Sequence, residues 1–338
     1  MAQRLGLMGC GLVAIYGHLP ALAQTEGVEL TAVYDPSGAQ LAALRKLWPE
    51  VQVFDDMDAF LASGIDAVTI TSPAPCHLEN IRAAARAGKH ILCEKPLGMT
   101  DAEIEEMMAV TQDAGVMLFT AFDYRFSPVA QKIRQLVAEK AIGEVRSLRL
   151  IYIWNLHGKY LTDADGNPVL NARREGRMLE GGPMVDCGVH QIDLARYWLQ
   201  QEVVSWTGRG AWVEQHTAPD HMYLHMDHQG GAHTMVEISF TYCQTAAEPI
   251  SLFSYDLIGT DGIIRFDRWS ERFEMRTAAG TQQFPFAAEK NFVGMYQAFV
   301  EALATGHSDT LPTAYDGLMA TRIARTATEQ AIAAHTEK

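Results

Sequence analysis

The sequence predicts an α/β protein with two domains, a doubly wound parallel sheet followed by an α+β domain with a largely antiparallel sheet. Three observations lead to this prediction. Short apolar runs alternate with helical patterns over the first 120 residues, which is typical of parallel βαβ units with helices on both faces of the sheet. Several strands of alternating polarity follow one another between residues 203 and 267, which is typical of antiparallel pairing. The length of 338 residues is long for one domain and suits two.

We place the first domain at residues 1–122. Its predicted strands are short and rich in aliphatic residues, and they fall at 4–9, 28–35, 51–54, 66–70, 90–94 and 116–120. The helices between them are predicted at 12–24, 37–48, 76–88 and 100–115. In such a sheet, ligands bind beyond the carboxyl ends of the strands.

The second domain is placed at residues 123–338. Its predicted helices lie near 128–139, 183–198, 291–304 and 313–334. Its predicted strands lie at 145–154, 203–212, 221–228, 232–240, 250–258 and 262–267. A polar stretch from 155 to 180 shows no periodicity. A polar segment of this length inside a domain is often a lid or a binding loop.

The composition is that of an ordinary globular protein, with 48% hydrophobic and 20% charged residues. The formal net charge is -14, and no basic cluster is dense enough for a nucleic-acid-binding surface. No apolar run reaches the roughly 18 residues of a membrane-spanning helix, and the apolar segment before Cys10 is too short for a leader peptide. The five cysteines are widely spaced and form no CxxC pair, which is typical of reduced thiols. We therefore expect a cytoplasmic protein that binds neither nucleic acid nor membranes.

A glycine-rich turn between the first strand and the first helix indicates a dinucleotide site. Residues 9–14, GCGLVA, fit the pattern G-x-G-x-x-G/A in the strand–turn–helix context that this motif requires. Gly9 allows the tight turn, Gly11 lets the backbone approach a pyrophosphate, and the start of the helix offers N–H groups to the phosphates. We assign Gly9, Gly11 and Leu12 to the cofactor site. The alternative is a glycine turn that binds no ligand.

Asp35 ends the second predicted strand, where a carboxylate is expected to hydrogen-bond the adenosine ribose diol. The same carboxylate would repel a 2′-phosphate, and no arginine stands at 36 or 37. The sequence therefore favours NAD over NADP. The alternative is that Asp35 caps the following helix.

Glu94, Lys95 and Pro96 stand just beyond the fifth predicted strand, in the segment HILCEKP. A lysine at that edge of a parallel sheet can hydrogen-bond a substrate oxygen and stabilise negative charge on it. The alternative is a surface salt bridge between Glu94 and a neighbour.

The helix predicted at 183–198 carries a line of ionisable residues between apolar neighbours. At about 100° per residue, Asp186, His190, Asp193 and Tyr197 fall within roughly 60° of one another. Burying such groups without partners costs several kcal/mol, so a cleft with a polar ligand would explain them. Asp186 can orient the imidazole of His190, which can then accept a proton near neutral pH. The alternative is a hydrogen-bonded structural triad at a domain interface.

Taken together, the motifs GxGxxA, EKP and GGxxxDxGxHxxD resemble those of the Gfo/Idh/MocA family of NAD(P)-dependent oxidoreductases, which includes glucose–fructose oxidoreductase and inositol dehydrogenase. The resemblance covers nearly the whole length and includes the stretch PAPCHLENIRAAARAGKHILCEKP at 73–96. It implies an N-terminal Rossmann domain. It also implies a C-terminal domain whose sheet commonly forms oligomer contacts, and hence a homodimer or homotetramer.

The resemblance also implies roles for individual residues. Lys95, Asp186 and His190 match the family's catalytic set, and Asp193 matches a frequent substrate-side residue. Positions near the nicotinamide end of the cofactor are matched by Thr71, Ser72, Pro73, His77 and Glu94. Asp123 stands where many relatives carry asparagine, and this departure puts in doubt the sugar contacts of its loop, which holds Tyr124 and Arg125.

Two further groups of residues were weighed for ligand binding. If the stretch 155–180 is a lid rather than an oligomer arm or a solvent-facing loop, its polar and aromatic residues can reach the substrate, and its arginines can bind a carboxylate. The residues concerned are Trp154, Asn155, His157, Arg173, Arg174 and Arg177. A run of histidines between 216 and 233 suggests a metal, but no cysteine or carboxylate evidently completes a tetrahedral set. We expect a surface or interface role for them and no metal site.

Three functions are compatible with these residues. The first is a dehydrogenase in which His190 removes a proton from a hydroxyl or ring hemiacetal of a sugar, polyol or sugar acid while hydride passes to NAD. The second is an NAD-dependent glycosidase, which oxidises its substrate transiently and eliminates the aglycone. The third is a dinucleotide sensor without catalysis, against which the intact Lys95, Asp186 and His190 set argues.

Overall fold

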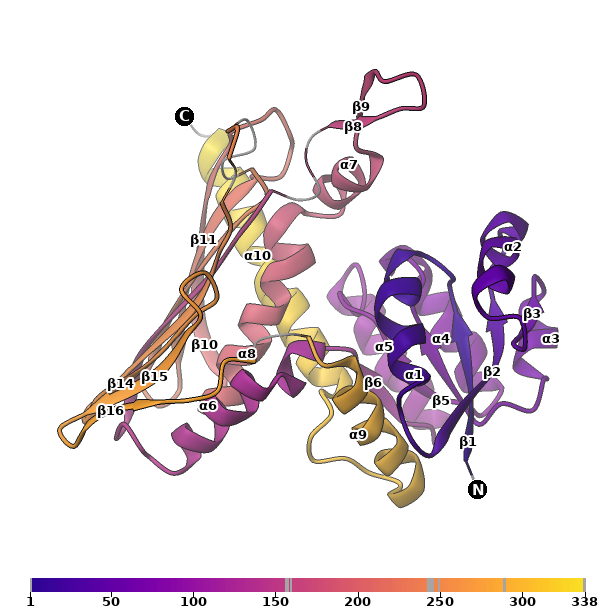
Figure 1. Cartoon of the computed structure of the whole chain (residues 1–338), viewed down its shortest axis with the longest axis horizontal. Helices are drawn as coiled ribbons and strands as arrows, with labels where there is room; N and C mark the ends of the chain where they lie inside the picture. Colours follow the sequence, from indigo (N-terminus) through magenta and orange to yellow (C-terminus); the bar gives the residue numbers. More distant parts are fainter. Residues whose placement is uncertain are drawn as a thin grey trace. The chain divides into compact units, whose positions relative to one another are not determined.

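Two main sheets organise the chain in the computed structural model, a parallel sheet of six strands and a mostly antiparallel sheet of eight (Figure 1). The structure describes residues 2–155, 158, 160–241, 246–248, 250–287 and 290–336. His157 and Cys243 lie outside the described residues. The predicted fold class, a doubly wound parallel sheet followed by an α+β part, is confirmed.

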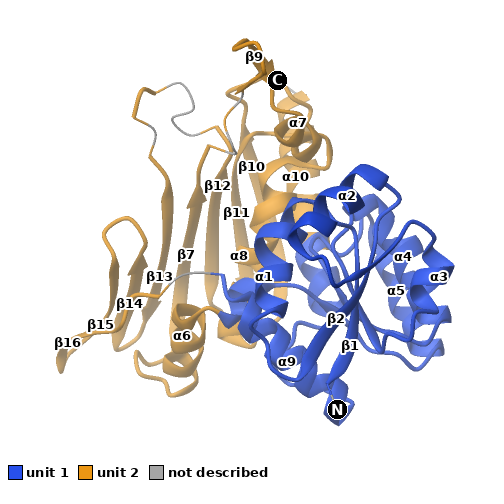
Figure 2. Ribbon diagram, turned by 45° about the vertical axis from the view of Figure 1, so that its right-hand side comes forward, with its two compact units in different colours: residues 1–126, 290–321 blue, residues 127–289, 322–338 orange. Residues whose placement is uncertain are grey.

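The chain divides by packing into two units (Figure 2). Unit 1 comprises residues 1–126 and 290–321, and unit 2 comprises residues 127–289 and 322–338. The segment 290–321 therefore follows most of unit 2 in sequence and packs with unit 1.

The sheet of unit 1 has the order β3-β2-β1-β4-β5-β6, with every neighbouring pair parallel. Its strands are β1 (Gln3–Met8), β2 (Val28–Tyr34), β3 (Gln52–Phe54), β4 (Ala67–Ile70), β5 (His90–Cys93) and β6 (Leu118–Thr120). The strand order reverses between β1 and β4, and the carboxyl ends at such a switch point form the usual ligand crevice of this fold.

Helices cover both faces of this sheet because successive side chains of its strands point to opposite sides. Leu5 and Leu7 of β1 pack in one apolar cluster, whereas Met8 packs in the other. The first cluster includes residues of α1 (Leu19–Leu22), α2 (Gly38–Leu47) and α9 (Phe292–Thr305). The second includes residues of α3 (Met57–Leu61), α4 (His77–Arg86) and α5 (Asp101–Asp113).

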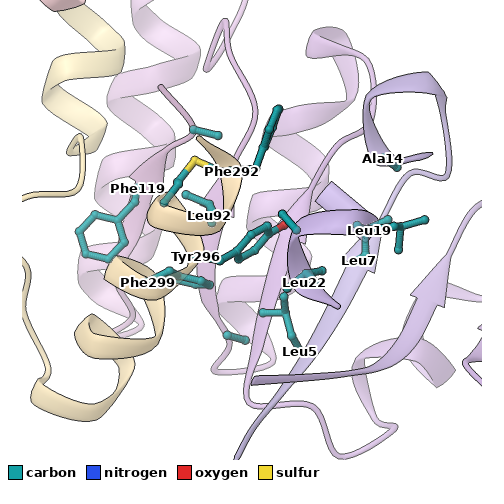
Figure 3. Packing of buried hydrophobic residues seen from close by; sticks show 14 of the residues in the cluster. Leu5, Leu7, Ala14, Leu19, Leu22, Leu92, Phe119, Phe292, Tyr296 and Phe299 are labelled. Carbon is teal, nitrogen blue, oxygen red and sulfur yellow. The ribbon is translucent and has the colours of Figure 1, made fainter. Parts of the chain in front are cut away.

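The returning helix α9 is an integral part of the first cluster. Figure 3 shows Phe292, Tyr296 and Phe299 pointing into the same core as Leu5 and the other labelled aliphatic residues. Each of these three aromatic residues is at most 9% exposed. Burying three large side chains contributes several kcal/mol, which explains why this segment packs with unit 1.

The sheet of unit 2 has the order β10-β11-β12-β7-β13-β14-β15-β16, and among these pairs only β12 with β7 is parallel. Its strands are β7 (Val145–Ile153), β10 (Val203–Ala211), β11 (His221–His228), β12 (His233–Ser239), β13 (Leu252–Gly259), β14 (Gly262–Asp267), β15 (Arg272–Thr277) and β16 (Gly280–Gln283). Its helices include α6 (Pro128–Ala138), α8 (Val189–Leu199) and the later part of α10 (Ala314–Thr336).

One face of this sheet packs on helices. Trp198 of α8 is fully buried, donates to Ala130 O of α6 at 3.0 Å and meets the Tyr255 ring edge-on. On β10, a Cβ added at Gly208 would lie 2.1 Å from Ala327 O, so this glycine lets α10 lie directly on the strand. The opposite face carries alternating half-exposed polar residues, as the strand period predicts.

Two predictions for unit 2 were wrong in detail. The stretch 155–180 contains a short hairpin of β8 (Tyr160–Thr162) and β9 (Pro168–Leu170), followed by α7 (Ala172–Leu179). All six hairpin residues are exposed, so no buried side produces a period of two that the sequence could display. Strands β15 and β16 were not predicted, because β16 is exposed throughout and β15 is rich in charged residues.

None of the helices in the described part of the chain combines the length and apolar character needed to cross a membrane.

Candidate active site

The glycine turn of unit 1 is held tightly against the turn that follows β4. Gly9 has φ of 100°, and a Cβ there would lie 2.6 Å from Ser72 N. Thr71 Oγ1 donates to Met8 O at 3.2 Å and also to Gly9 O. Only glycine fits this position. A Cβ at Gly11 would meet no atom within 4 Å, so the space in front of the turn is open, as the approach of a pyrophosphate requires.

The Asp35 carboxylate ties this turn to the second strand. Asp35 Oδ2 accepts from Cys10 N at 2.7 Å, and Oδ1 accepts from Ser37 N at 2.8 Å. A carboxylate offers about four lone-pair sites, so Asp35 can support the turn and still accept from a ribose diol. Leu12, the third predicted residue of the turn, is 53% exposed beside Gly11. The residues present therefore fit a dinucleotide.

Cys10, between the two glycines, is buried. Burial, together with the charge of Asp35, raises the pKa of Cys10 to about 12. Its thiol therefore stays protonated at neutral pH and is a poor nucleophile.

His77 joins two segments at the predicted nicotinamide end. Its Nδ1 lies 3.1 Å from Leu97 O and its Nε2 lies 2.9 Å from Ser72 O. The ring is 1% exposed, and burial lowers its pKa despite these hydrogen bonds. Because both nitrogens contact backbone carbonyls, His77 holds the Thr71–Pro73 turn against the segment after Lys95. The sequence predicted the location of His77 and not this bridging role.

Glu94 lies at the carboxyl end of β5 in a buried hydrogen-bond network. Glu94 Oε1 lies 2.9 Å from His18 Nε2, and Glu94 Oε2 accepts from Lys95 N at 3.1 Å. Burial alone would raise the pKa of Glu94, but the hydrogen bond and charge of His18, with the charges of Lys95 and Lys290, lower it to about 2. The alternative interpretation of Glu94 as part of a surface salt bridge is therefore wrong, since its partner is a fully buried histidine.

Asp123 is paired with a lysine from the returning segment of unit 1. Lys290 Nζ lies 3.0 Å from Asp123 Oδ2 and 5.0 Å from the centre of the Tyr124 ring. Burial raises the pKa of Asp123, and Lys290 opposes this shift. The pair neutralises a carboxylate at the position where the family resemblance implies an asparagine. Arg125, in the same turn, is paired with Asp316 at 3.2 Å.

In unit 2, the helix that carries Asp186 and His190 is not α-helical throughout. It begins with a π-helical turn, η4 (Met184–Gly188), and continues as α8. A π turn closes i to i+5 hydrogen bonds, so it contains more residues than the 3.6 of an α turn. The 100° per residue assumed in the sequence prediction therefore does not apply to Met184–Gly188. Such π turns occur frequently at functional sites.

The predicted ionisable residues of this helix are buried. Asp186, His190 and Asp193 are 7%, 2% and 1% exposed, which excludes a solvated helix face. Asp186 Oδ1 lies 3.6 Å from Arg177 Nε, and Asp186 Oδ2 accepts from Cys187 Sγ at 3.4 Å. Asp186 is thus supported by a cation from α7, within the stretch that the sequence indicated as a lid.

The other residues of that stretch have different environments. Arg174 is fully buried, and it donates to Phe240 O at 3.0 Å and pairs with Glu214 at 3.1 Å. The prediction that Arg174 reaches a substrate is wrong, because these contacts make it a structural residue. Arg173, at the start of α7, is half-buried, and Trp154 stacks on the Tyr152 ring at 5.8 Å. Their substrate contacts stay predictions.

Four of the histidines between 216 and 233 pair with carboxylates or with one another, and His228 contacts Thr234 Oγ1 at 2.9 Å. His233 Nδ1 lies 2.8 Å from Asp227 and its Nε2 lies 3.1 Å from His225. No group of three or more potential metal ligands occurs among the described residues.

Sequence reasoning missed three residues that contact the predicted set. His18 and Tyr296 complete the network of Glu94, and Lys290 pairs with Asp123. His18 stands seven residues after Gly11 and had a weak sequence signal, a polar residue in an apolar helix. Lys290 and Tyr296 had none, because nothing in their neighbourhood shows with which domain they pack.

Two family models match this chain. Residues 3–122 match the model described as "Oxidoreductase family, NAD-binding Rossmann fold", and residues 130–265 match the model described as "GFO/IDH/MocA C-terminal domain".

Named relatives are similar over somewhat more than half of their own length. D-glucoside 3-dehydrogenase of Escherichia coli (strain K12) is 32% identical over 198 residues, which cover 58% of this chain and 54% of the relative. Inositol 2-dehydrogenase of Rhizobium meliloti (strain 1021) is 31% identical over 212 residues, covering 62% and 59%. An oxidoreductase from Agrobacterium radiobacter, solved in complex with NAD+, L-tartaric acid and magnesium, has the same fold, with a TM-score of 0.81, 21% identity and coverage of 99% and 100%.

Proposed function

Because the chain belongs to the Gfo/Idh/MocA family of oxidoreductases, we propose that it is an NAD-dependent dehydrogenase of a sugar, polyol or sugar acid. The reaction is oxidation of a hydroxyl group or ring hemiacetal. The observation that carries this proposal is the position of Lys95 at the carboxyl edge of the parallel sheet, directly after the buried Glu94 carboxylate. Relatives named as dehydrogenases of a glucoside and of inositol support the substrate class.

Each catalytic residue has one role in this proposal. His190 accepts the proton of the substrate hydroxyl, and Asp186, itself held by Arg177, supports the imidazolium that forms. Lys95 stabilises negative charge on the same oxygen as the proton leaves. Bound NAD supplies the hydride acceptor. Lys95 belongs to unit 1 and His190 to unit 2.

NAD is proposed as the cofactor in preference to NADP. Asp35 accepts two backbone hydrogen bonds from the segment that a 2′-phosphate would approach. A second negative charge beside this carboxylate would be unfavourable.

Association through the sheet of unit 2 and a cytoplasmic location are also proposed. Tyr223 is 38% exposed in the middle of β11, between the exposed Arg209 on β10 and the half-buried Glu237 on β12. This face can therefore contact a second copy of the chain. Sedimentation velocity tests it, since a monomer at micromolar concentration would contradict the assignment.

The activity is tested with a panel of aldoses, inositols and sugar acids, monitored by the absorbance of NADH. Wild-type protein is expected to reduce NAD with at least one of them. Lys95→Met and His190→Ala are each expected to lose about 10²–10⁴-fold in kcat, and both should still bind NAD. His307→Ala, an exposed histidine that follows α9, is the matched control and keeps full activity. Cleavage of an aryl glycoside without net NADH would instead indicate the glycosidase.

A further inference from the structure

A network from three separate segments of unit 1 surrounds the residue that precedes Lys95. His18 closes the π-helical turn η1 (Ala14–His18) after the glycine motif, Glu94 follows β5, and Tyr296 lies on the returning helix α9. His18 Nδ1 lies 2.7 Å from Tyr296 Oη, and His18 Nε2 lies 2.9 Å from Glu94 Oε1. His18 and Tyr296 are both fully buried.

The hydrogen-bond directions in this network follow from the chemistry of its members. The ionised Glu94 carboxylate only accepts, so His18 Nε2 carries a hydrogen. The Nε2–H of His18 therefore donates to Glu94, while the other ring nitrogen, Nδ1, contacts Tyr296 Oη at 2.7 Å. Tyr296 Oη is itself within 3.2 Å of Thr69 Oγ1, so the ring of His18 is fixed from both sides.

The same carboxylate is bonded to the backbone of Lys95. Glu94 Oε2 accepts from Lys95 N at 3.1 Å, while Oε1 is held by His18. One carboxylate thus links the first helix of the domain to the peptide from which the Lys95 side chain starts. A displacement of a catalytic group by about 1 Å can cost about 10²-fold in rate, so a link of this kind matters for catalysis.

We propose that His18, anchored by Tyr296, is a positioning residue for Lys95, because it holds the Glu94 carboxylate and through it the Lys95 peptide in one arrangement. The inference rests on the proposed function, in which Lys95 is the group that stabilises charge on the substrate oxygen. Tyr296 lies beyond residue 265 and is therefore outside the part of the chain that the second family model matches.

Other titratable groups also face this carboxylate. Cys93 on β5 and His77 on α4 are buried within reach of its charge. Lys290, which pairs with Asp123, lowers the pKa of Glu94 from the other side. Tyr16 and Tyr124 face Lys290.

The first test compares His18→Leu with His18→Gln in the full-length protein. Glutamine can still donate to Glu94 and leucine cannot. We expect His18→Leu to lower kcat by about tenfold or more and His18→Gln to recover most of the loss, with KM for NAD within about threefold of wild type. Equal kcat in both folded variants would overturn the proposal.

Tyr296→Phe serves if the histidine variants fail to fold, since it keeps the ring in the core and removes only the hydroxyl. We expect a loss of about three- to tenfold in kcat, the size of one buried hydrogen bond. Thr111→Val removes another buried hydroxyl bond of unit 1, Thr111 Oγ1 to Met107 O at 2.7 Å, and should leave kcat unchanged. A similar fall in kcat for both variants would show that the role of Tyr296 is only structural.

The second test measures the rate at which Lys95 reacts with an amine reagent as a function of pH, by mass spectrometry of the full-length protein. Glu94→Gln removes a negative charge, so Lys95 should lose its proton at lower pH than in wild type. His18→Leu removes the donor to Glu94 and His18→Gln keeps one, so the profile should change in His18→Leu and stay near that of wild type in His18→Gln. Changed profiles in Glu94→Gln and His18→Leu support the proposal, and unchanged profiles in both variants contradict it.

The labelling experiment does not depend on turnover. If wild-type protein oxidised no sugar while both labelling shifts occurred, the proposed function would fail and the positioning inference would stand. If wild type were active and neither the labelling nor kcat responded to His18, the inference alone would fail.

Discussion

Two π-helical turns, η1 in unit 1 and η4 in unit 2, are built alike and hold their ionisable side chains differently. Each is preceded by a glycine in the left-handed region, Gly9 with φ of 100° and Gly182 with φ of 72°. His18 of η1 has partners on both nitrogens at 2.7 and 2.9 Å. Asp186 of η4 lies 3.6 Å from Arg177 and accepts from the Cys187 thiol at 3.4 Å, both longer contacts.

This difference indicates a supporting role for His18 and a catalytic role for Asp186. The ring of His18 has no further donor to offer, so it can only support its neighbours. The Asp186 carboxylate contacts the Arg177 cation and the Cys187 thiol, and a carboxylate is also a strong acceptor for an imidazole N–H. Substitutions in η1 are therefore expected to change stability and to act on kcat through the geometry of Lys95, and substitutions around η4 to act on the chemical step directly.

The largest expected effect concerns the two glycines. Gly9→Ala combines backbone strain of about 1–2 kcal/mol with a Cβ 2.6 Å from Ser72 N, so the loss in the free energy of unfolding should exceed that strain, and NAD binding should be lost. Gly182→Ala, whose Cβ would lie 3.0 Å from Pro219 O, should lose about the strain alone. Urea denaturation and NAD titration measure both. Equal losses would remove the distinction between the two turns.

The next effect is the loss of stability at acidic pH that comes from the buried network of His18, Glu94 and Tyr296. The pKa of Glu94 is about 2 in the folded protein and 4.5 as the ordinary value. Its ionised form therefore stabilises the fold above about pH 4.5, and this contribution is lost as the pH falls towards 2. The advantage of wild type over Glu94→Gln should shrink by up to about 3 kcal/mol over that range. Unfolding by urea at several pH values measures this advantage, and Glu139→Gln, at an exposed glutamate, is the control. A stability difference between wild type and Glu94→Gln that stays constant with pH would contradict an ionised Glu94 in the folded protein.

A smaller effect is expected for η4, the turn that carries Asp186. Arg177→Met leaves Asp186 without its cation, so we expect kcat to fall by about tenfold, while the KM for NAD stays within about twofold. Arg86→Met, an exposed arginine of α4, should have no effect. A loss of stability without a loss of kcat in Arg177→Met would contradict the catalytic role given to η4.

The smallest effect concerns the choice between NAD and NADP at the glycine turn that precedes η1. Asp35→Asn keeps the size of the side chain and removes its charge. We expect affinity for NAD to fall by about three- to tenfold, because one charged hydrogen-bond acceptor becomes neutral, and affinity for NADP to rise relative to it. Calorimetric titration with both dinucleotides measures the ratio. A ratio that does not change would mean that Asp35 serves only the turn.

The sequence predicted unit 1 well because its signals are local. Buried parallel strands appear as apolar runs, and a glycine turn needs Gly9 whatever the rest of the chain does. The π-helical turn η4 was not predictable, because a helical wheel assumes 100° per residue and the segment MVDCG has no residue pattern that indicates a π turn. The partners Tyr296 and Lys290 were missed because packing between segments far apart in sequence leaves no periodic signal.

The most direct test of the account is a crystal structure of the wild-type protein with NAD and a polyol. We expect Lys95 Nζ and the His190 ring to contact the same substrate hydroxyl, with the nicotinamide against its carbon. A complex in which only one of the two side chains reaches that hydroxyl would contradict the catalytic roles proposed for Lys95 and His190.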